Sequence, residues 1–177
     1  MKKIPAAALL LALAGCADNA AKAPANQITF NDFEAVEGWS AGEPVPSLTK
    51  ERAHSGTYAL RVGNGVDFRL GYRNVLGKIS TARLHKLTIQ AWVFVPGPQA
   101  ECVLVTQVLG NEQNKNVFWD GLKIKEATKT VGKWVLIEKE ITLPPTATPE
   151  TQLLVYLWRS NSPQPTYLDD LRISRVE

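Results

Sequence analysis

The chain has 177 residues, 45% of them hydrophobic and 21% charged, and its 20 Lys and Arg against 17 Asp and Glu give a formal net charge of +3. Apart from Lys2 and Lys3, the basic residues are scattered singly, without a run or a stripe, so the charge pattern does not favour nucleic acid as a partner. A chain of this length suits one domain with a core large enough to fold without disulfides.

The first sixteen residues have the features of an export signal. Lys2 and Lys3 precede an apolar stretch over residues 4–14, and Gly15 and Cys16 follow it. A charged start, an apolar stretch and a small residue before a cleavage site are typical of signal peptides. The stretch is too short to cross a hydrocarbon core about 30 Å thick, which takes roughly 20 apolar residues. We therefore predict that residues 1–16 are a signal peptide ending at Cys16.

The segment Leu13-Ala14-Gly15-Cys16 resembles the lipobox of bacterial lipoproteins. The resemblance implies that Cys16 carries acyl chains such as palmitate, and several chains anchor a protein to a membrane more firmly than one. In Gram-negative lipoproteins an Asp directly after this cysteine is typical of retention at the inner membrane. Ala17 stands there, which implies the outer membrane of the cell envelope. The alternative is an ordinary buried Cys16 behind a standard signal peptide.

Acylation of Cys16 leaves Cys102 as the only other cysteine of the chain. No disulfide framework and no Cys-based zinc site can then form within one chain. Cys102 begins an apolar run, so we expect a buried and unreactive thiol.

Residues 17–26 are rich in alanine and have no apolar periodicity, which predicts a flexible tether before a domain over residues 27–177. In the domain, short runs of β-branched, aromatic and aliphatic residues alternate with turn residues, and no long helical period competes with them. We predict an all-β fold, a jelly-roll sandwich of two antiparallel sheets. The predicted strands are Tyr58–Val62, Leu87–Val95, Cys102–Leu109, Val117–Ile124, Trp134–Leu143, Leu153–Trp158 and Tyr167–Val176.

Alternation along two of these strands separates core residues from outward ones, because successive side chains of a strand point to opposite faces. In Leu87–Val95, every second residue from Leu87 is aliphatic, which leaves Gln90 and Trp92 on the other face. In Leu153–Trp158 the aliphatic set begins at Leu153, and Tyr156 and Trp158 belong to the other set. Exposed aromatic and amide side chains on a sheet indicate a recognition surface.

A series of motifs extends over nearly the whole predicted domain: Phe33-Glu34, Gly38-Trp39, residues 53–62, residues 87–93, Gly132-Lys133-Trp134 and residues 167–173. In this order the motifs resemble the jelly-roll carbohydrate-binding modules of the galactose-binding-like superfamily, above all those attached to hydrolases of plant polysaccharides. The resemblance implies a sandwich that binds sugar, although such folds also host unrelated functions.

Sugar binding needs flat aromatic side chains with hydrogen-bonding groups around them, because a pyranose ring has an apolar C–H face and a rim of hydroxyls. Trp158 is the first candidate, since the polar loop 159–162 follows it; Trp119 and Tyr72 are further possibilities on the loop side. Core packing is the alternative for each aromatic residue. The full set of carbohydrate-binding candidates is Trp158, Tyr156, Trp92, Gln90, Arg61, Trp119 and Tyr72.

The same resemblance implies a structural calcium ion that ties the two ends of the domain together, since calcium takes six to eight oxygen ligands. Asp169 shares parity with the core residues of its strand, so we expect it to face inward. The alternative is that the acids are hydrogen-bonded or salt-bridged without a metal. The metal candidates are Glu34 and Asp169 first, then Asp32 and Asp170, with Ser55 to Thr57 as carbonyl donors.

Together these features predict a surface-anchored lipoprotein that binds a glycan or polysaccharide without altering it. A structural or adhesive lipoprotein that binds a protein partner is the main alternative, and a polysaccharide-active enzyme is the third. Two carboxyl groups must flank a cleaved glycosidic bond, and the neighbours Asp169 and Asp170 face opposite ways. Glu138 and Glu140 share a face, but Lys139 between them favours an ordinary solvated strand.

Overall fold

The computed structural model describes residues 23–36, 44–68, 70–112 and 115–176. The predicted signal peptide, its Cys16 and residues 17–22 of the predicted tether lie outside the described residues, so they stay predictions. In the described ranges no helix is both long enough and apolar enough to cross a bilayer.

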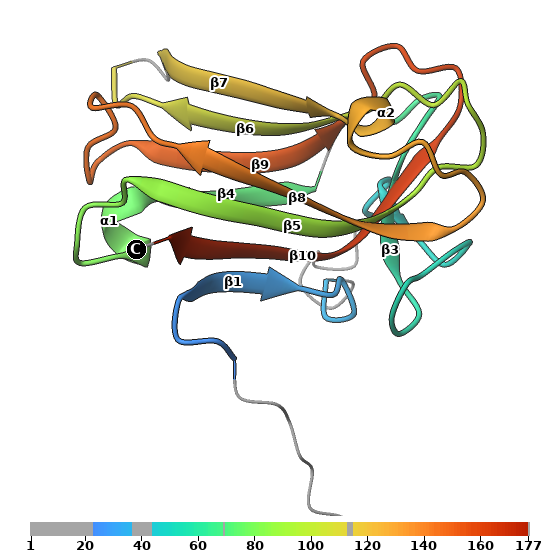
Figure 1. Cartoon of the computed structure of the whole chain (residues 1–177), viewed down its shortest axis with the longest axis horizontal. Helices are drawn as coiled ribbons and strands as arrows, with labels where there is room; N and C mark the ends of the chain where they lie inside the picture. The colour runs from blue at the N-terminus through green and yellow to red at the C-terminus, as the bar shows by residue number, and fades with distance from the viewer. Residues whose placement is uncertain (1–22, 37–43, 69, 113–114, 177) are drawn as a thin grey trace, which may run out of the picture.

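The described residues form ten strands and two one-turn helices (Figure 1). All seven predicted strands are present with bounds shifted by one residue or not at all, because their apolar runs are unambiguous. Three strands were not predicted: the short strands β1 and β2, and the polar strand β4. The elements are β1 (Gln27–Asn31), β2 (Leu48–Thr49), β3 (Ala59–Val62), β4 (Gly71–Val75), α1 (Leu76–Ile79), β5 (Lys86–Phe94), β6 (Val103–Leu109), β7 (Asn116–Lys123), α2 (Ile124–Ala127), β8 (Trp134–Thr142), β9 (Gln152–Trp158) and β10 (Thr166–Val176).

The strands build two antiparallel sheets that pack face to face (Figure 1), which confirms the predicted jelly-roll sandwich. The six-stranded sheet has the order β2-β3-β10-β5-β8, and β1 also pairs with β10. Strands β3 and β1 share one edge of β10: β3 pairs with its first residues and β1 with Leu171 to Ser174. The four-stranded sheet has the order β4-β9-β6-β7.

The core lies between the sheets and consists of the residues that alternation predicted. Leu87 and Ile89 on β5 and Leu153 and Val155 on β9 are fully buried and belong to one apolar cluster. Cys102 is buried in the same cluster as a free thiol, and burial raises its pKa. A raised pKa keeps the thiol protonated near neutral pH, which agrees with the predicted unreactive cysteine.

One strand departs from simple alternation. The pairing of β10 with β5 shifts between Asp169 and Arg172, and Asp170 has φ 50, so β10 carries a bulge there. The extra residue puts Leu168 and Leu171, three positions apart, both in the core. Asp169 pairs with Trp92 and lies on the outer side of the six-stranded sheet. The expectation that Asp169 faces inward is therefore wrong, because the bulge reverses the parity between it and Leu171.

Candidate functional site

Apart from Tyr72, the candidate sugar-binding residues lie on two opposite outer faces of the sandwich and cannot line one surface. The alternation of side chains shows which residues of a strand point outward, but not to which sheet the strand belongs. Strands β5 and β9 belong to different sheets. Gln90 and Trp92 on β5 and Arg61 on β3 belong to the six-stranded sheet, whereas Trp119 on β7 and Tyr156 and Trp158 on β9 belong to the four-stranded sheet.

The candidates on the six-stranded sheet are already engaged by protein groups. The imidazole of His54 stacks on the Trp92 indole with ring centroids 3.8 Å apart and planes 12° apart. Gln90 Nε2 donates to Glu138 Oε2 over 2.5 Å, and Arg61 Nε lies 3.4 Å from Glu51 Oε2. This face therefore offers a sugar few unpaired groups.

The imidazole of His54 has a structural role on this face. Its Nδ1 lies 2.6 Å from Asp170 Oδ2, and Asp170 Oδ1 accepts a hydrogen bond from the Ser55 hydroxyl. Asp170 thereby fixes the imidazole over Trp92.

Tyr72 was expected in a loop on the ligand side, and the structure places it elsewhere. It lies on β4, pairs with the buried Val155 and packs against the core between the sheets. Burial raises the pKa of its phenol, while a hydrogen bond with Asn74 lowers it. A residue on the inner face of β4 cannot line the outer surface, so we remove Tyr72 from the site.

The outer surface of the sheet β4-β9-β6-β7, which we call the four-stranded face, is organised in rows across the strands. One row runs from Gly71 through Tyr156 and Val105 to Gly121, and the next from Arg73 through Leu154 and Gln107 to Trp119. Trp158 follows Tyr156 on the same face of β9. The face thus carries aromatic rings, amides and one guanidinium.

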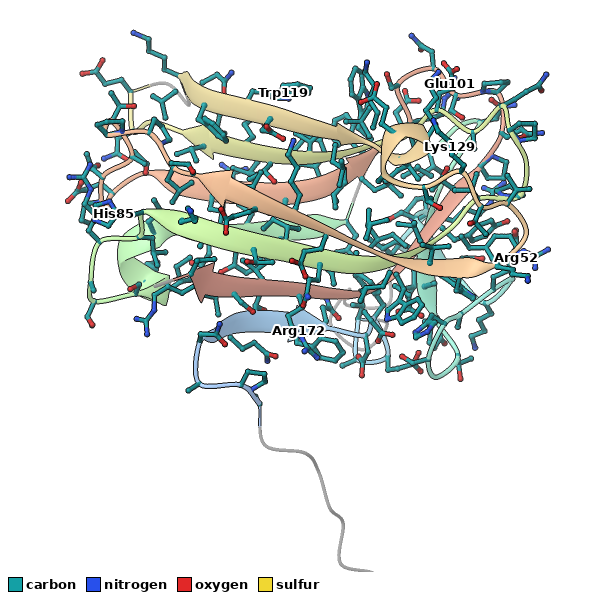
Figure 2. The ribbon with its side chains drawn as sticks, viewed as in Figure 1. Arg52, His85, Glu101, Trp119, Lys129 and Arg172 are labelled. Carbon is teal, nitrogen blue, oxygen red and sulfur yellow. The ribbon has the colours of Figure 1, made fainter. Side chains whose placement is uncertain are left out.

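The Trp119 ring lies along the surface of this face. A Cβ built on Gly121 would come within 2.4 Å of the far end of the indole, so the ring extends over the glycine. Val105, in the same row as Gly121, points outward and is still 0% exposed because side chains cover it. Trp119 is 48% exposed at the β7 edge of the sheet (Figure 2). The indole therefore presents a flat apolar surface to solvent.

Tyr156 continues this surface toward β4. Its hydroxyl lies 3.3 Å from Gln107 Oε1, burial raises its pKa, and a hydrogen bond with Trp119 lowers it. The exposed ring of Phe68 packs against it at a tilt, with centroids 5.9 Å apart. Trp119, Tyr156 and Phe68 therefore follow one another from β7 to the β4 side of the face.

Polar side chains surround these rings. Arg73 Nε donates to Gln152 Oε1 over 2.7 Å, and Gln107 Nε2 donates to Asn116 Oδ1 over 3.3 Å. The sequence-based list of sugar-binding candidates contains none of these four polar residues, and it does not contain Phe68. Gln107 was recognisable as the polar member of the apolar run on β6, but nothing in the sequence places Arg73 beside Gln152.

The predicted metal residues hold the turn at residues 53–58 in place. Asp169 is 0% exposed, its Oδ2 accepts the backbone N–H groups of His54 at 2.7 Å and Ser55 at 3.2 Å, and its Oδ1 accepts that of Asp170 at 2.8 Å. Burial raises the pKa of Asp169 and these hydrogen bonds lower it, with burial the larger effect. The N–H groups are what makes a buried carboxylate tolerable here.

Glu34 contacts the same turn from the other side. Its Oε1 accepts the N–H groups of Thr57 at 2.8 Å and Tyr58 at 2.7 Å, while Asp32 Oδ1 accepts the N–H of Glu34 itself at 3.2 Å. Gly56 lies against the Glu34 side chain, where a Cβ would come within 2.4 Å of the carboxyl carbon. Glu34 and Asp169 therefore act as acceptors for backbone N–H groups.

As placed, these side chains do not form a metal cluster by themselves. Over residues 23–36, 44–68, 70–112 and 115–176, no three His, Cys, Asp or Glu side chains gather as ligands for a metal ion. The carboxylates of Glu34 and Asp169 face N–H donors, which is the metal-free alternative left open by the sequence.

Calcium stays a prediction of the family resemblance, and chelation tests it. The resemblance predicts that EDTA lowers the melting temperature and that excess calcium restores it, because a bound ion stabilises only the folded state. Thermal unfolding followed by circular dichroism measures both. An identical melting temperature with EDTA and with calcium would leave the N–H groups as the sole partners of these carboxylates.

The comparisons with known proteins agree with this geometry. The model of a family described as a carbohydrate binding domain matches residues 25–166. The tandem of CBM22-1 and CBM22-2 from Xyn10C of Paenibacillus barcinonensis superimposes with a TM-score of 0.59 and 16% identity, over 89% of this chain and 52% of that one. The CBM22-2 xylan-binding domain of the same protein gives a TM-score of 0.52 and 15% identity, over 84% and 99%. Identities this low show a shared fold. A search of curated proteins found no match.

Proposed function

Because the chain belongs to the carbohydrate-binding domain family, we propose that it binds a polysaccharide across the four-stranded face and does not cleave it. The observation that carries this proposal is the exposed Trp119 ring, which extends over Gly121 and continues into Tyr156. A flat ring matches the C–H face of a pyranose, and the surrounding amides and guanidinium match its hydroxyls.

The arrangement of the rings favours an extended ligand that crosses the strands. From β7 to β4 there are three interstrand spacings, about 14 Å in all. Trp119 lies at one end of this path and Phe68 at the other, with Tyr156 between them. A surface of this length contacts several consecutive sugar units, which suits a polymer better than a single monosaccharide.

The chemistry of the face supports binding without hydrolysis. On the described strands β4, β9, β6 and β7, register places no Asp or Glu side chain on the outer surface; Asp120 faces inward opposite Thr106. Glycoside hydrolysis takes two carboxyl groups beside the bond that breaks. Glu138 and Glu140 lie on the other sheet and are paired with Gln90 and Lys86.

Xylan is the first ligand to test, because one of the similar structures is a xylan-binding domain. Affinity electrophoresis through gels that contain xylan, mixed-linkage glucan, mannan or galactan, followed by titration calorimetry, measures the preference. We expect retardation by at least one β-linked plant polysaccharide and no release of reducing sugar. Equal mobility in all gels would contradict the proposal and favour a protein partner instead.

We also propose that Cys16 anchors the domain to the outer membrane, supported by the lipobox resemblance of residues 13–16. The variant Cys16→Ser lacks the acylated thiol, so we expect it in the soluble fraction after cell lysis, whereas the unaltered chain sediments with membranes and incorporates labelled palmitate. Cys102→Ser is the matched control and should sediment like the unaltered chain. Membrane sedimentation of Cys16→Ser would contradict the anchor.

A further inference from the structure

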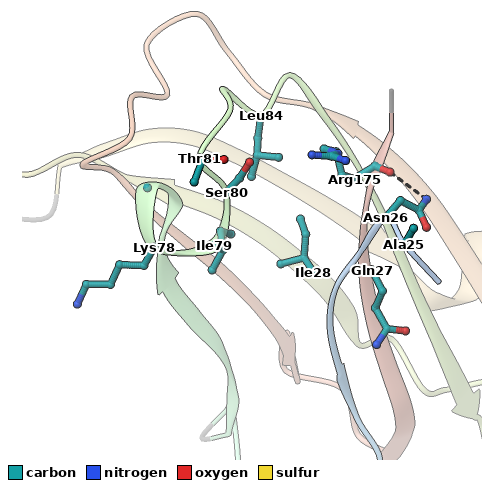
Figure 3. A pocket seen from close by; sticks show the side chains of 11 residues that line it. Ala25, Asn26, Gln27, Ile28, Lys78, Ile79, Ser80, Thr81, Leu84 and Arg175 are labelled. Carbon is teal, nitrogen blue, oxygen red and sulfur yellow. Dashed lines mark hydrogen bonds between the residues drawn. The ribbon is translucent and has the colours of Figure 1, made fainter. Parts of the chain in front are cut away.

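A cavity of about 380 Å³ lies at the end of the sandwich where the described chain begins (Figure 3). Residues 25–28, residues 77–81 with Leu84, and Arg175 near the end of β10 line it. Ile28, Ile79 and Leu84 give it apolar walls, and Thr81 brings a hydroxyl group to the lining, whereas the Ser80 hydroxyl donates to the Ala82 carbonyl. None of these residues belongs to the rows of the four-stranded face, so the cavity is separate from the proposed polysaccharide site.

Arg175 is the unusual member of this lining because its position directs it toward the inside of the sandwich. Leu171 and Ile173, on the same side of β10, are core residues, and Arg175 pairs with the fully buried Leu87 of β5. In Figure 3 its side chain reaches from β10 toward Leu84, into the space between the two walls. A guanidinium group therefore stands at the mouth of the apolar core.

No acidic side chain compensates this charge in the part of the chain that the structure describes. Among the described residues, Arg61 pairs with Glu51 and Arg159 with Asp67, whereas Arg175 forms no ion pair with a carboxylate, a property that it shares with the exposed Lys78. The lining contains no Asp or Glu. The hydrogen bonds of Arg175 with Asn26 use its backbone N–H and C=O, which leaves the guanidinium fork available.

We propose that this cavity, which we call the Arg175 cavity, binds an oxyanion, either a carboxylate or a phosphate group carried by a small ligand. Guanidinium binds both groups through two parallel hydrogen bonds, and a partly desolvated site strengthens such bonds. The Thr81 hydroxyl adds a donor on the opposite wall, and the apolar walls suit the carbon skeleton of the ligand. An acidic sugar and a phosphate-bearing molecule are the two sources of this chemistry.

Calorimetry with the purified protein tests the proposal, with glucuronate and inorganic phosphate as probes and glucose as the neutral match to glucuronate. All titrations use one constant ionic strength, so that general screening does not differ between them. We expect at least one of the two anions to bind and glucose not to bind at this cavity. Binding of glucuronate alone identifies a sugar carboxylate as the preferred group, and binding of phosphate alone identifies a phosphate.

Variants at Arg175 locate the binding. Arg175→Gln should weaken anion binding about tenfold or more, as expected for the loss of a charge-assisted pair, and Arg175→Lys, which keeps the charge, should retain part of the affinity. Lys133→Gln is the control and should bind like the unaltered protein. Lys133 is exposed just before the end of β8 that pairs with Phe94, whereas Arg175 pairs with Leu87 at the other end of β5. Thermal unfolding of each variant confirms that it is folded.

Two results would overturn the proposal: no binding of either anion, or equal binding by folded Arg175→Gln and the unaltered protein. Neither result depends on polysaccharide binding, which is measured at Trp119 on the four-stranded face. Loss of one function with retention of the other therefore shows which of the two proposals fails.

Discussion

Replacing Trp119 with alanine is expected to weaken polysaccharide binding by about 2 kcal/mol, roughly 30-fold, which is the loss typical of a tryptophan hot spot in a binding surface. The indole is the largest exposed ring of the four-stranded face, and its removal opens the surface over Gly121 and Val105. Titration calorimetry with the polysaccharide that binds best measures the change. Because the ring is half exposed, the free energy of unfolding should change little.

Leu136→Ala provides a matched control for this experiment. Leu136 is also 48% exposed, but it lies on β8 of the six-stranded sheet, opposite Trp92. The variant removes an apolar side chain with the same exposed fraction, but on the face that we do not propose for binding. We therefore expect its affinity for the polysaccharide to be unchanged. A loss of affinity in Leu136→Ala with full binding by Trp119→Ala would move the site to the six-stranded sheet.

The second large effect concerns stability. Asp169→Ala should lower the free energy of unfolding by about 3 kcal/mol, because an unpaired buried donor costs roughly 1–3 kcal/mol and three backbone N–H groups lose their acceptor. Water reaches part of the turn at residues 53–58 in the variant and hydrogen-bonds to the freed N–H groups. The loss of unfolding free energy is therefore smaller than the sum for three unpaired buried donors. Urea unfolding followed by circular dichroism measures it.

Glu101→Ala is the control for Asp169→Ala. Glu101 forms an exposed ion pair with Lys125, and exposed pairs contribute about 1 kcal/mol or less. Similar losses in the two variants would mean that the Asp169 carboxylate does not hold the turn.

The sequence predicted the strands that carry aliphatic residues on every second position, such as β5 and β9, because burial of one face leaves a clear period. Strand β4 has no such pattern: Tyr72 and Asn74 face inward, and Gly71 and Arg73 face outward. Its pairing with β9, and not its composition, makes it a strand. The bulge at Asp170 was equally hidden, since a non-glycine residue with positive φ leaves no signature in the sequence.

The candidate site was predicted in part. Outward positions for Tyr156 and Trp158 followed from alternation and are confirmed. Trp92 also faces outward as predicted, but it lies on the opposite sheet from Tyr156, because the sheet membership of β5 depends on long-range pairing. Phe68 gave no signal, since it precedes β4 in a segment without alternation and reaches the site only by contact with Tyr156.

The indole N–H signals of the tryptophans in a ¹H–¹⁵N spectrum report the ligand-bound face directly. During titration with an oligosaccharide of the bound polysaccharide, the signals of Trp119 and Trp158 should shift or broaden, while those of Trp92 and Trp134 stay in place. The opposite pattern, with Trp92 and Trp134 shifting and Trp119 unaffected, would contradict binding at the four-stranded face.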